Sequence, residues 1–99
     1  MRYERYRWNE TRGDQYDDWG FSTFWMERGE DGYATRQMEV YDNGNVLKYD
    51  SSHLDDEYGM LSDVTLEIEE LEESQTEFIT AEEFEAAWSG SIAMNRNTK

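Results

Sequence analysis

The chain has 99 residues, no cysteine and a formal net charge of −15, from 24 acidic and 9 basic residues. The lack of cysteine excludes disulfide bonds and thiolate metal ligands, and the acidic excess disfavours direct binding to nucleic acid or anionic lipid, because like charges repel. Four Trp, seven Tyr and four Phe supply large apolar side chains, so we expect a folded core despite the charge.

The N-terminal third predicts two strands separated by a long loop. Residues 2–8 have the two-residue period of an outermost or half-exposed strand, with Tyr3 and Trp8 on opposite faces. Two glycines and three aspartates make residues 9–20 a loop. The two-residue period returns in residues 21–27, which form the second predicted strand.

Turn signals place two further strands before the middle of the chain. Gly-Glu-Asp-Gly at 29–32 is a turn that leads to a predicted strand at residues 33–41. Asn43-Gly44 is a pair favoured where both central residues of a tight turn need positive φ. Residues 46–50 then resume the alternation, so the third and fourth strands are predicted to form a hairpin.

The second half of the chain is harder to interpret. Residues 51–59, which include the single histidine, read as a loop. Residues 63–71 fit both the alternation of a strand and the stripe of a helix; we favour a strand over 64–69. Thr80 and Glu83 form a capping box that predicts the start of a helix, with Gly90 as its stop.

Together these elements predict an α+β fold: an antiparallel sheet of four to five strands with one C-terminal helix packed on one face. We expect a single acidic domain over residues 1–90, followed by a loosely held tail at 91–99 in which Ile92 and Met94 could make a contact. No apolar run approaches the ~20 residues of a membrane helix, so we expect no membrane association and a cytoplasmic location, which is the host cell cytoplasm if a phage encodes the protein.

Three segments resemble a widespread family of small bacterial domains of unknown function. They are the Tyr3–Trp8 strand, the segment Arg36-Gln37-Met38-Glu39-Val40-Tyr41-Asp42-Asn43-Gly44, and the ending from Ile79 to Trp88, which is the most specific. The resemblance covers residues from about 33 to 88, and residues 9–32 and the lack of proline depart from it. It implies an antiparallel sheet with a C-terminal helix and a setting near toxin–immunity or phage-conflict genes, and it implies no catalytic residue.

The sequence gives little support for catalysis. Ser51, Ser52, His53, Asp55 and Asp56 are neighbours in one loop, but catalytic triads are assembled by the fold from separate segments. The segment starting at Asp50 has leucine where a calcium-binding EF-hand needs an oxygen ligand, and it lacks the required glycine. We therefore expect no catalytic residue, no metal site and no cofactor.

Acidic residues of the second half are the strongest functional signal. Residues 51–99 hold 13 acidic and 2 basic groups, against 11 and 7 in residues 1–50. The alternative interpretation is that this acidity serves solubility or adaptation to salt. The predicted partner-binding residues are the carboxylates and the loop aromatics, which we expect to be exposed: Glu67, Glu69, Glu70, Glu72, Glu73, Asp55, Asp56, Glu57, Tyr58, Trp19 and Tyr16.

These observations favour a non-catalytic inhibitor that binds a basic protein, such as a nuclease, a toxin or a CRISPR effector complex, with its carboxylates in place of nucleic-acid phosphates. An immunity protein and an anti-defence protein (anti-CRISPR type) fit equally well, and the oligomeric state stays open. The alternatives are a small hydrolase or ligand-binding domain that uses the Ser51 to Asp56 loop, and an accessory subunit of a larger complex.

Overall fold

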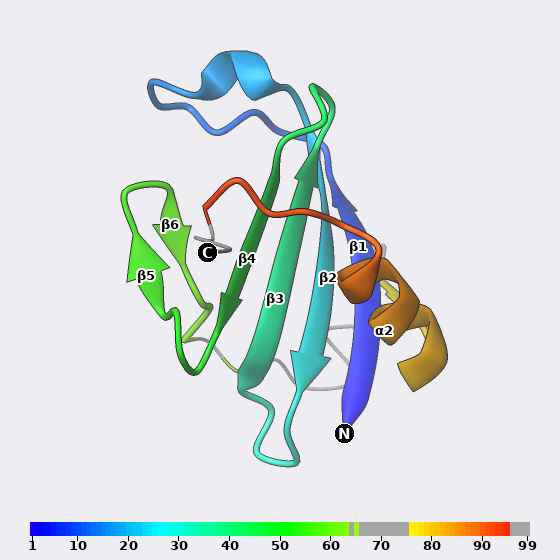
Figure 1. The fold of residues 1–99 in the computed structure, drawn as a ribbon. Helices are drawn as coiled ribbons and strands as arrows, with labels where there is room; N and C mark the ends of the chain where they lie inside the picture. The colour runs from blue at the N-terminus through cyan, green and yellow to red at the C-terminus, as the bar shows by residue number, and fades with distance from the viewer. Residues whose placement is uncertain (64, 66–75, 96–99) are drawn as a thin grey trace.

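The computed structural model describes residues 1–63, 65 and 76–95. Five antiparallel strands form one sheet in the order β4-β3-β2-β1-β7, and two short strands form a separate hairpin (Figure 1). The predicted α+β class with a C-terminal helix is confirmed. The elements are β1 (Arg2–Trp8), the 3-10 helix η1 (Asp17–Trp19), β2 (Ser22–Arg28), β3 (Ala34–Tyr41), β4 (Val46–Asp50), β5 (Asp55–Asp56), β6 (Gly59–Met60), β7 (Thr76–Phe78) and α2 (Ala81–Ser89).

The four strands of the first half lie where the alternation predicts them, with bounds that move by one residue at most. The Asn-Gly turn joins β3 to β4, with a hydrogen bond from the Tyr41 N–H to the Asn45 carbonyl at 2.9 Å. Gly44 has φ +94°, but Asn43 does not have the positive φ expected of both residues. The β2–β3 register shifts between Glu27 and Arg28. The bulge lies inside β3, which starts at Ala34, one residue later than predicted.

Helix α2 covers one face of the sheet, in front of β1 and β2 (Figure 1). Its capping box is present as predicted: the Thr80 hydroxyl accepts from the Glu83 N–H at 3.1 Å, and the Glu83 carboxylate accepts from the Thr80 N–H at 3.2 Å. Phe84 is fully buried and contacts the Tyr3 ring, 5.4 Å between centroids. The cap and this aromatic contact together fix where the helix starts and which face it buries.

The opposite face of the sheet carries the main aromatic core. Trp19, Tyr41, Leu47 and Tyr49 are buried together there, and Tyr16, Tyr58 and Leu61 pack against them. Trp19 comes from η1 and Tyr58 from the turn between β5 and β6. The loop of residues 9–20 and the β5–β6 hairpin therefore cover the core on this face.

Three segments of the second half differ from their predictions or lie outside the described residues. The predicted loop at 51–59 contains most of the β5–β6 hairpin, whose strands are two residues long and so carry no alternation to detect. The predicted strand at 64–69 lies outside the described residues. Residues 91–95 are not loosely held: the Met94 N–H donates to the Val46 carbonyl at 2.8 Å, and the Asn95 side-chain amide donates to the Lys48 carbonyl and accepts from the Lys48 N–H.

Candidate functional site

Arg12 is the centre of a cluster that joins the 9–20 loop to the β5–β6 hairpin. Its guanidinium lies 5.3 Å from the ring centroids of both Tyr16 and Trp19 and 5.8 Å from that of Tyr41. It also donates to the Tyr58 carbonyl and, at 3.0 Å, to the Tyr41 hydroxyl. Cation–π contacts to three rings hold the charge where few water molecules reach it. We call these five residues the Arg12 cluster.

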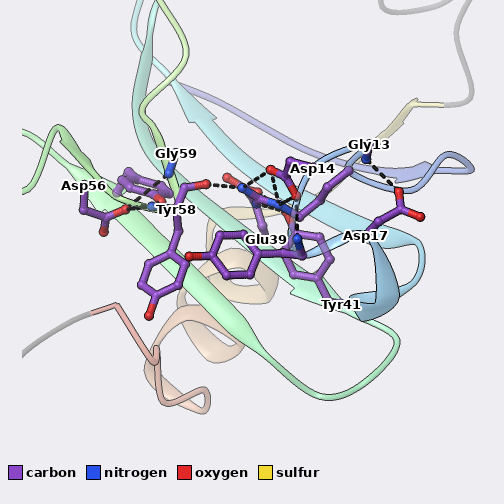
Figure 2. Close-up of polar contacts among 11 residues, drawn as sticks. Gly13, Asp14, Asp17, Glu39, Tyr41, Asp56, Tyr58 and Gly59 are labelled. Atoms are coloured by element: carbon purple, nitrogen blue, oxygen red, sulfur yellow. Dashed lines mark hydrogen bonds and ion pairs between the residues drawn. The ribbon is translucent and has the colours of Figure 1, made fainter.

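Ring contacts within the Arg12 cluster fix the relative position of its two loops. The Tyr58 ring lies 5.3 Å from Tyr16 and 5.8 Å from Trp19, between centroids. Figure 2 shows Tyr58 and Gly59 of the hairpin near Tyr41 and Asp14. Two segments about 40 residues apart in sequence therefore form one continuous surface.

A buried carboxylate lies beneath the Arg12 cluster. Glu39 is 5% exposed, accepts from the Tyr41 hydroxyl at 2.5 Å and from the Gln37 amide at 2.9 Å, and has a raised pKa because of its burial. The Gln37 amide also donates to the Met60 carbonyl and accepts from the Ser62 N–H. Burial and the Glu39 charge together raise the pKa of Tyr41. This chain of hydrogen bonds connects β3 to the hairpin.

Asp56 holds the hairpin to β4 and to the segment at 91–95. It accepts hydrogen bonds from the Tyr49 hydroxyl (2.9 Å), the Asn95 amide (2.9 Å) and the Tyr58 N–H (2.8 Å), and its Oδ2 is 2.7 Å from His53 Nε2. Burial alone would raise the pKa of Asp56, but the hydrogen bonds from His53 and the other donors outweigh it and lower the pKa to about 2. Asp56 therefore points inward as a structural anion.

Exposed carboxylates lie beside the Arg12 cluster on both of its loops. Asp17 and Asp18 belong to η1, while Asp55 and Glu57 belong to the hairpin, and all four are exposed. Hydrogen bonds from the Thr11 side chain and the Gly13 N–H lower the pKa of Asp17, so it stays ionised at neutral pH. We call these four residues the acidic rim.

Five arginines and Lys48 are engaged by other groups of the chain. Arg5 pairs with Glu77, Arg7 with Asp42 at 2.7 Å, Arg12 with Asp14 at 3.1 Å, Arg28 with Glu4 at 2.6 Å, and Arg36 with Glu27 at 2.6 Å and with Glu85. The Lys48 ammonium donates to the carbonyls of Trp88 and Ser91, each at 2.5 Å. None of these ion pairs includes a residue of the acidic rim, so the rim keeps its negative charge.

The structure brings together only part of the predicted site. Tyr16, Trp19 and Tyr58 meet in the Arg12 cluster, with Asp55 and Glu57 beside them. Trp19 is not an exposed loop aromatic: it is 8% exposed, because η1 folds its ring against Tyr41. Asp56 is used internally. The predicted acidic run lies outside the described residues: Glu67, Glu69, Glu70, Glu72 and Glu73.

The sequence reasoning missed Arg12 and Glu39. Glu39 is buried, as are Glu4 and Glu27, although acidic residues are mostly exposed in proteins. One signal was available: Glu39 has the same parity in β3 as Gln37 and Tyr41, and a face that mixes a tyrosine with two polar groups is a candidate for a buried hydrogen-bond network. Nothing in the sequence around Arg12 indicates that three rings surround it.

Side chains of the Ser51 to Asp56 loop are placed mainly by structural hydrogen bonds. The Ser52 hydroxyl donates to Asp50 at 2.8 Å, and the His53 ring lies between Asp56 and the Tyr49 ring, whose centroid is 5.9 Å away. A serine nucleophile would instead donate to a histidine base. The described side chains therefore show a histidine–aspartate pair without an attached nucleophile.

The described residues, 1–63, 65 and 76–95, bear on two further classes of site, metal sites and membrane-spanning helices. In these ranges no group of three or more His, Asp or Glu side chains is arranged to hold a metal ion. No helix there is both long enough and apolar enough to cross a membrane.

The fold and the site define a class: a small acidic α+β domain with a five-stranded antiparallel sheet, a C-terminal helix on one face and a lid of loops on the other. Its family is shown by a match of residues 16–93 to the model of the domain of unknown function DUF6881. The chain belongs to this family. The match includes residues 16–32, part of the region that departs from the resemblance, and it does not include the Tyr3–Trp8 strand. No curated protein and no solved structure matches the chain.

Proposed function

We propose that the chain is a non-catalytic binding protein whose acidic rim occupies a basic surface of a nucleic-acid-handling enzyme. One observation carries the proposal: five arginines pair with carboxylates of the chain itself, whereas Asp17, Asp18, Asp55 and Glu57 are exposed and belong to none of these ion pairs. A surface of this kind attracts a positively charged cleft and repels nucleic acid.

The Arg12 cluster supports the proposal because it makes the rim rigid. Binding by a loose acidic loop would require its side chains and backbone to be ordered on association, which costs affinity. Here η1 and the hairpin are held to each other by aromatic contacts and by the Arg12 hydrogen bonds. The rim carboxylates are thus arranged before the partner arrives.

The biological role we propose is inhibition, in which the rim takes the place that phosphates occupy in a nuclease, a toxin or a CRISPR effector complex. Immunity against a toxin and anti-defence activity of a phage remain equal versions of this role. The acidic run at 67–73 extends the proposal, since its carboxylates would add to the same negative field.

The test is a titration of the chain into the partner's nuclease assay, after the partner has been captured from the native host at low salt and identified by mass spectrometry. Asp55→Lys/Glu57→Lys removes half of the rim. The matched control, Glu30→Lys/Asp31→Lys, makes the same change in net charge at the β2–β3 turn, at the other end of the sheet (Figure 1).

We expect the rim variant to slow association by at least about tenfold at low salt, with a smaller effect of the control variant and a loss of the difference near 1 M salt. Equal effects of the two variants would show that net charge alone matters and would contradict the proposal. Charge reversal of Glu67, Glu69, Glu70, Glu72 and Glu73 tests separately whether the run takes part.

The second candidate function is a hydrolase or ligand-binding site at the Ser51 to Asp56 loop. The observation in its favour is the 2.7 Å contact between His53 and Asp56, which could orient a histidine base. His53→Ala separates the two functions: it would abolish an activity of this loop but leave rim-dependent association intact.

A further inference from the structure

A groove lies on the helix-bearing face of the sheet, opposite the Arg12 cluster. It has a volume of about 730 Å³, within the range of about 300–1,000 Å³ that small-molecule sites occupy. Its floor is made by two registered rows of side chains across β1, β2 and β3, and Ala87 of α2 and Ser91 form its wall. The rows are Arg7, Thr23 and Val40, and Arg5, Trp25 and Met38.

The floor of the groove combines positive charge with apolar surface. Arg5 and Arg7 are two residues apart on β1, so their side chains project from the same face about 6.8 Å apart. The Arg5 guanidinium lies 5.1 Å from the Trp25 ring centroid, and that of Arg7 lies 5.6 Å from the Phe21 ring centroid. These ring contacts favour positions of both guanidinium groups at the groove.

The two arginines differ in how firmly their partners hold them. Arg7 donates to Asp42, which is fixed because it also accepts from the Phe21 N–H at 2.9 Å. Arg5 pairs with Glu77, whose side chain is 64% exposed, against 48% for Asp42. An exposed ion pair of this kind contributes little to stability, and one carboxylate uses only part of the five N–H donors of a guanidinium. Arg5 is therefore the cation that a ligand can engage.

We propose that this groove binds a small organic anion with an aromatic body, such as an aryl carboxylate or sulfonate. The acidic group pairs with Arg5 in competition with Glu77, and the ring lies on Trp25 and Val40, above the buried Met38, against the Ala87 wall. Charge complementarity selects the anion, since these two arginines supply the positive charge among the groove's described residues. The small side chain of Ala87 leaves room for a flat ring beside the helix.

The experiment uses the fluorescent probe 8-anilinonaphthalene-1-sulfonate, an aromatic sulfonate, and its uncharged analogue N-phenyl-1-naphthylamine. Binding to the folded full chain is followed by probe fluorescence and by NMR shifts of the Trp25 indole and the Ala87 methyl group. We expect the sulfonate to shift these two signals and to bind more tightly than the uncharged analogue.

Two variants give opposite expected results. Arg5→Gln should weaken sulfonate binding by about tenfold, the value of one charge-assisted hydrogen bond, whereas Glu77→Gln should strengthen it by about threefold or more, because the competitor is removed. Glu30→Gln is the matched control, with the same change in net charge away from the groove. If Arg5→Gln does not fold, the comparison of sulfonate affinity between Glu77→Gln and Glu30→Gln still tests the proposal. The proposal is overturned if the sulfonate does not shift the groove signals, if the uncharged analogue binds as tightly, or if Glu77→Gln and Glu30→Gln behave alike.

Discussion

At the scale of single residues, the core holds charges that an alternation pattern assigns to solvent. Glu4 and Arg28 are 0% and 2% exposed, and Arg28 Nε donates to Glu4 Oε1 at 2.6 Å. Arg28 also donates to the Gly32 carbonyl at 2.9 Å. A buried pair offsets its own desolvation only while both partners and their hydrogen bonds are present. Stability therefore requires that Glu4 and Arg28 be present together.

Removing one partner of this pair should be costly. We expect Arg28→Met to lower the free energy of unfolding by about 3–5 kcal/mol, because the Glu4 carboxylate is left buried without its cation. The double variant Glu4→Met/Arg28→Met should recover much of this loss. Urea unfolding followed by Trp fluorescence measures both, and a double variant no more stable than Arg28→Met would show that the charge pair is not the cause.

Gly20 is required for two reasons that can be separated. It has φ +88°, and a Cβ there would lie 2.8 Å from Asp42 Cβ. Gly44 has a similar φ of +94° but nothing within 4 Å of such a Cβ. Gly44→Ala carries the cost of a positive φ, about 1–2 kcal/mol. Gly20→Ala carries at least this cost, because φ +88° with ψ −158° is a region essentially restricted to glycine, and it adds a clash worth about 1–3 kcal/mol. Equal free energies of unfolding for the two variants would contradict this account.

At the scale of elements, regular structure was predictable wherever a local signal exists. Period-two alternation located β1 to β4, the Asn-Gly pair located the β3–β4 turn, and Thr80 with Glu83 located the start of α2. The β5–β6 hairpin has strands too short for a period, and its position depends on Tyr58 and Asp56 meeting residues distant in sequence. Contacts of this kind are produced by the fold and leave no local pattern.

Asp56 should make the stability of the hairpin depend on acid. Its pKa of about 2 in the folded protein is below the ordinary value of 3.8, so the stability that it contributes is fully present above about pH 4 and is lost as the pH falls toward 2. We expect Asp56→Asn to cost roughly 2 kcal/mol at pH 6 and progressively less below pH 4. Unfolding by urea at a series of pH values measures this, and a cost that does not change with pH would contradict the assignment.

At the scale of the whole molecule, charge repulsion acts across the entire structure. The described chain measures 33 × 31 × 23 Å, close to the Debye length of about 30 Å at 0.01 M salt and far above that of about 3 Å at 1 M. At low salt nearly every carboxylate therefore repels every other. The candidate site was predictable only in part. Composition gives the amount of charge, but only the fold shows which carboxylates are exposed and which, like Glu39 and Asp56, accept hydrogen bonds inside the protein.

Salt should stabilise this protein. We expect the thermal midpoint to rise by roughly 5 °C between about 0.01 M and 0.5 M sodium chloride, because screening reduces the repulsion. The variant Glu30→Lys/Asp31→Lys, with a net charge smaller by four, should show a shallower rise in differential scanning calorimetry. A midpoint that falls with salt would indicate that the internal ion pairs dominate instead.

The segment at 91–95 has a consequence for how the sheet meets other molecules. Along the free side of β4, the Val46 carbonyl accepts from Met94, the Lys48 peptide groups pair with the Asn95 amide, and Asp50 exchanges hydrogen bonds with the His53 backbone. The Asn95 side-chain amide takes the place of a peptide group, so these backbone groups of the edge strand β4 already have hydrogen-bond partners. A strand from another molecule therefore cannot readily pair with β4, which is the first step of amyloid growth and of β-augmentation.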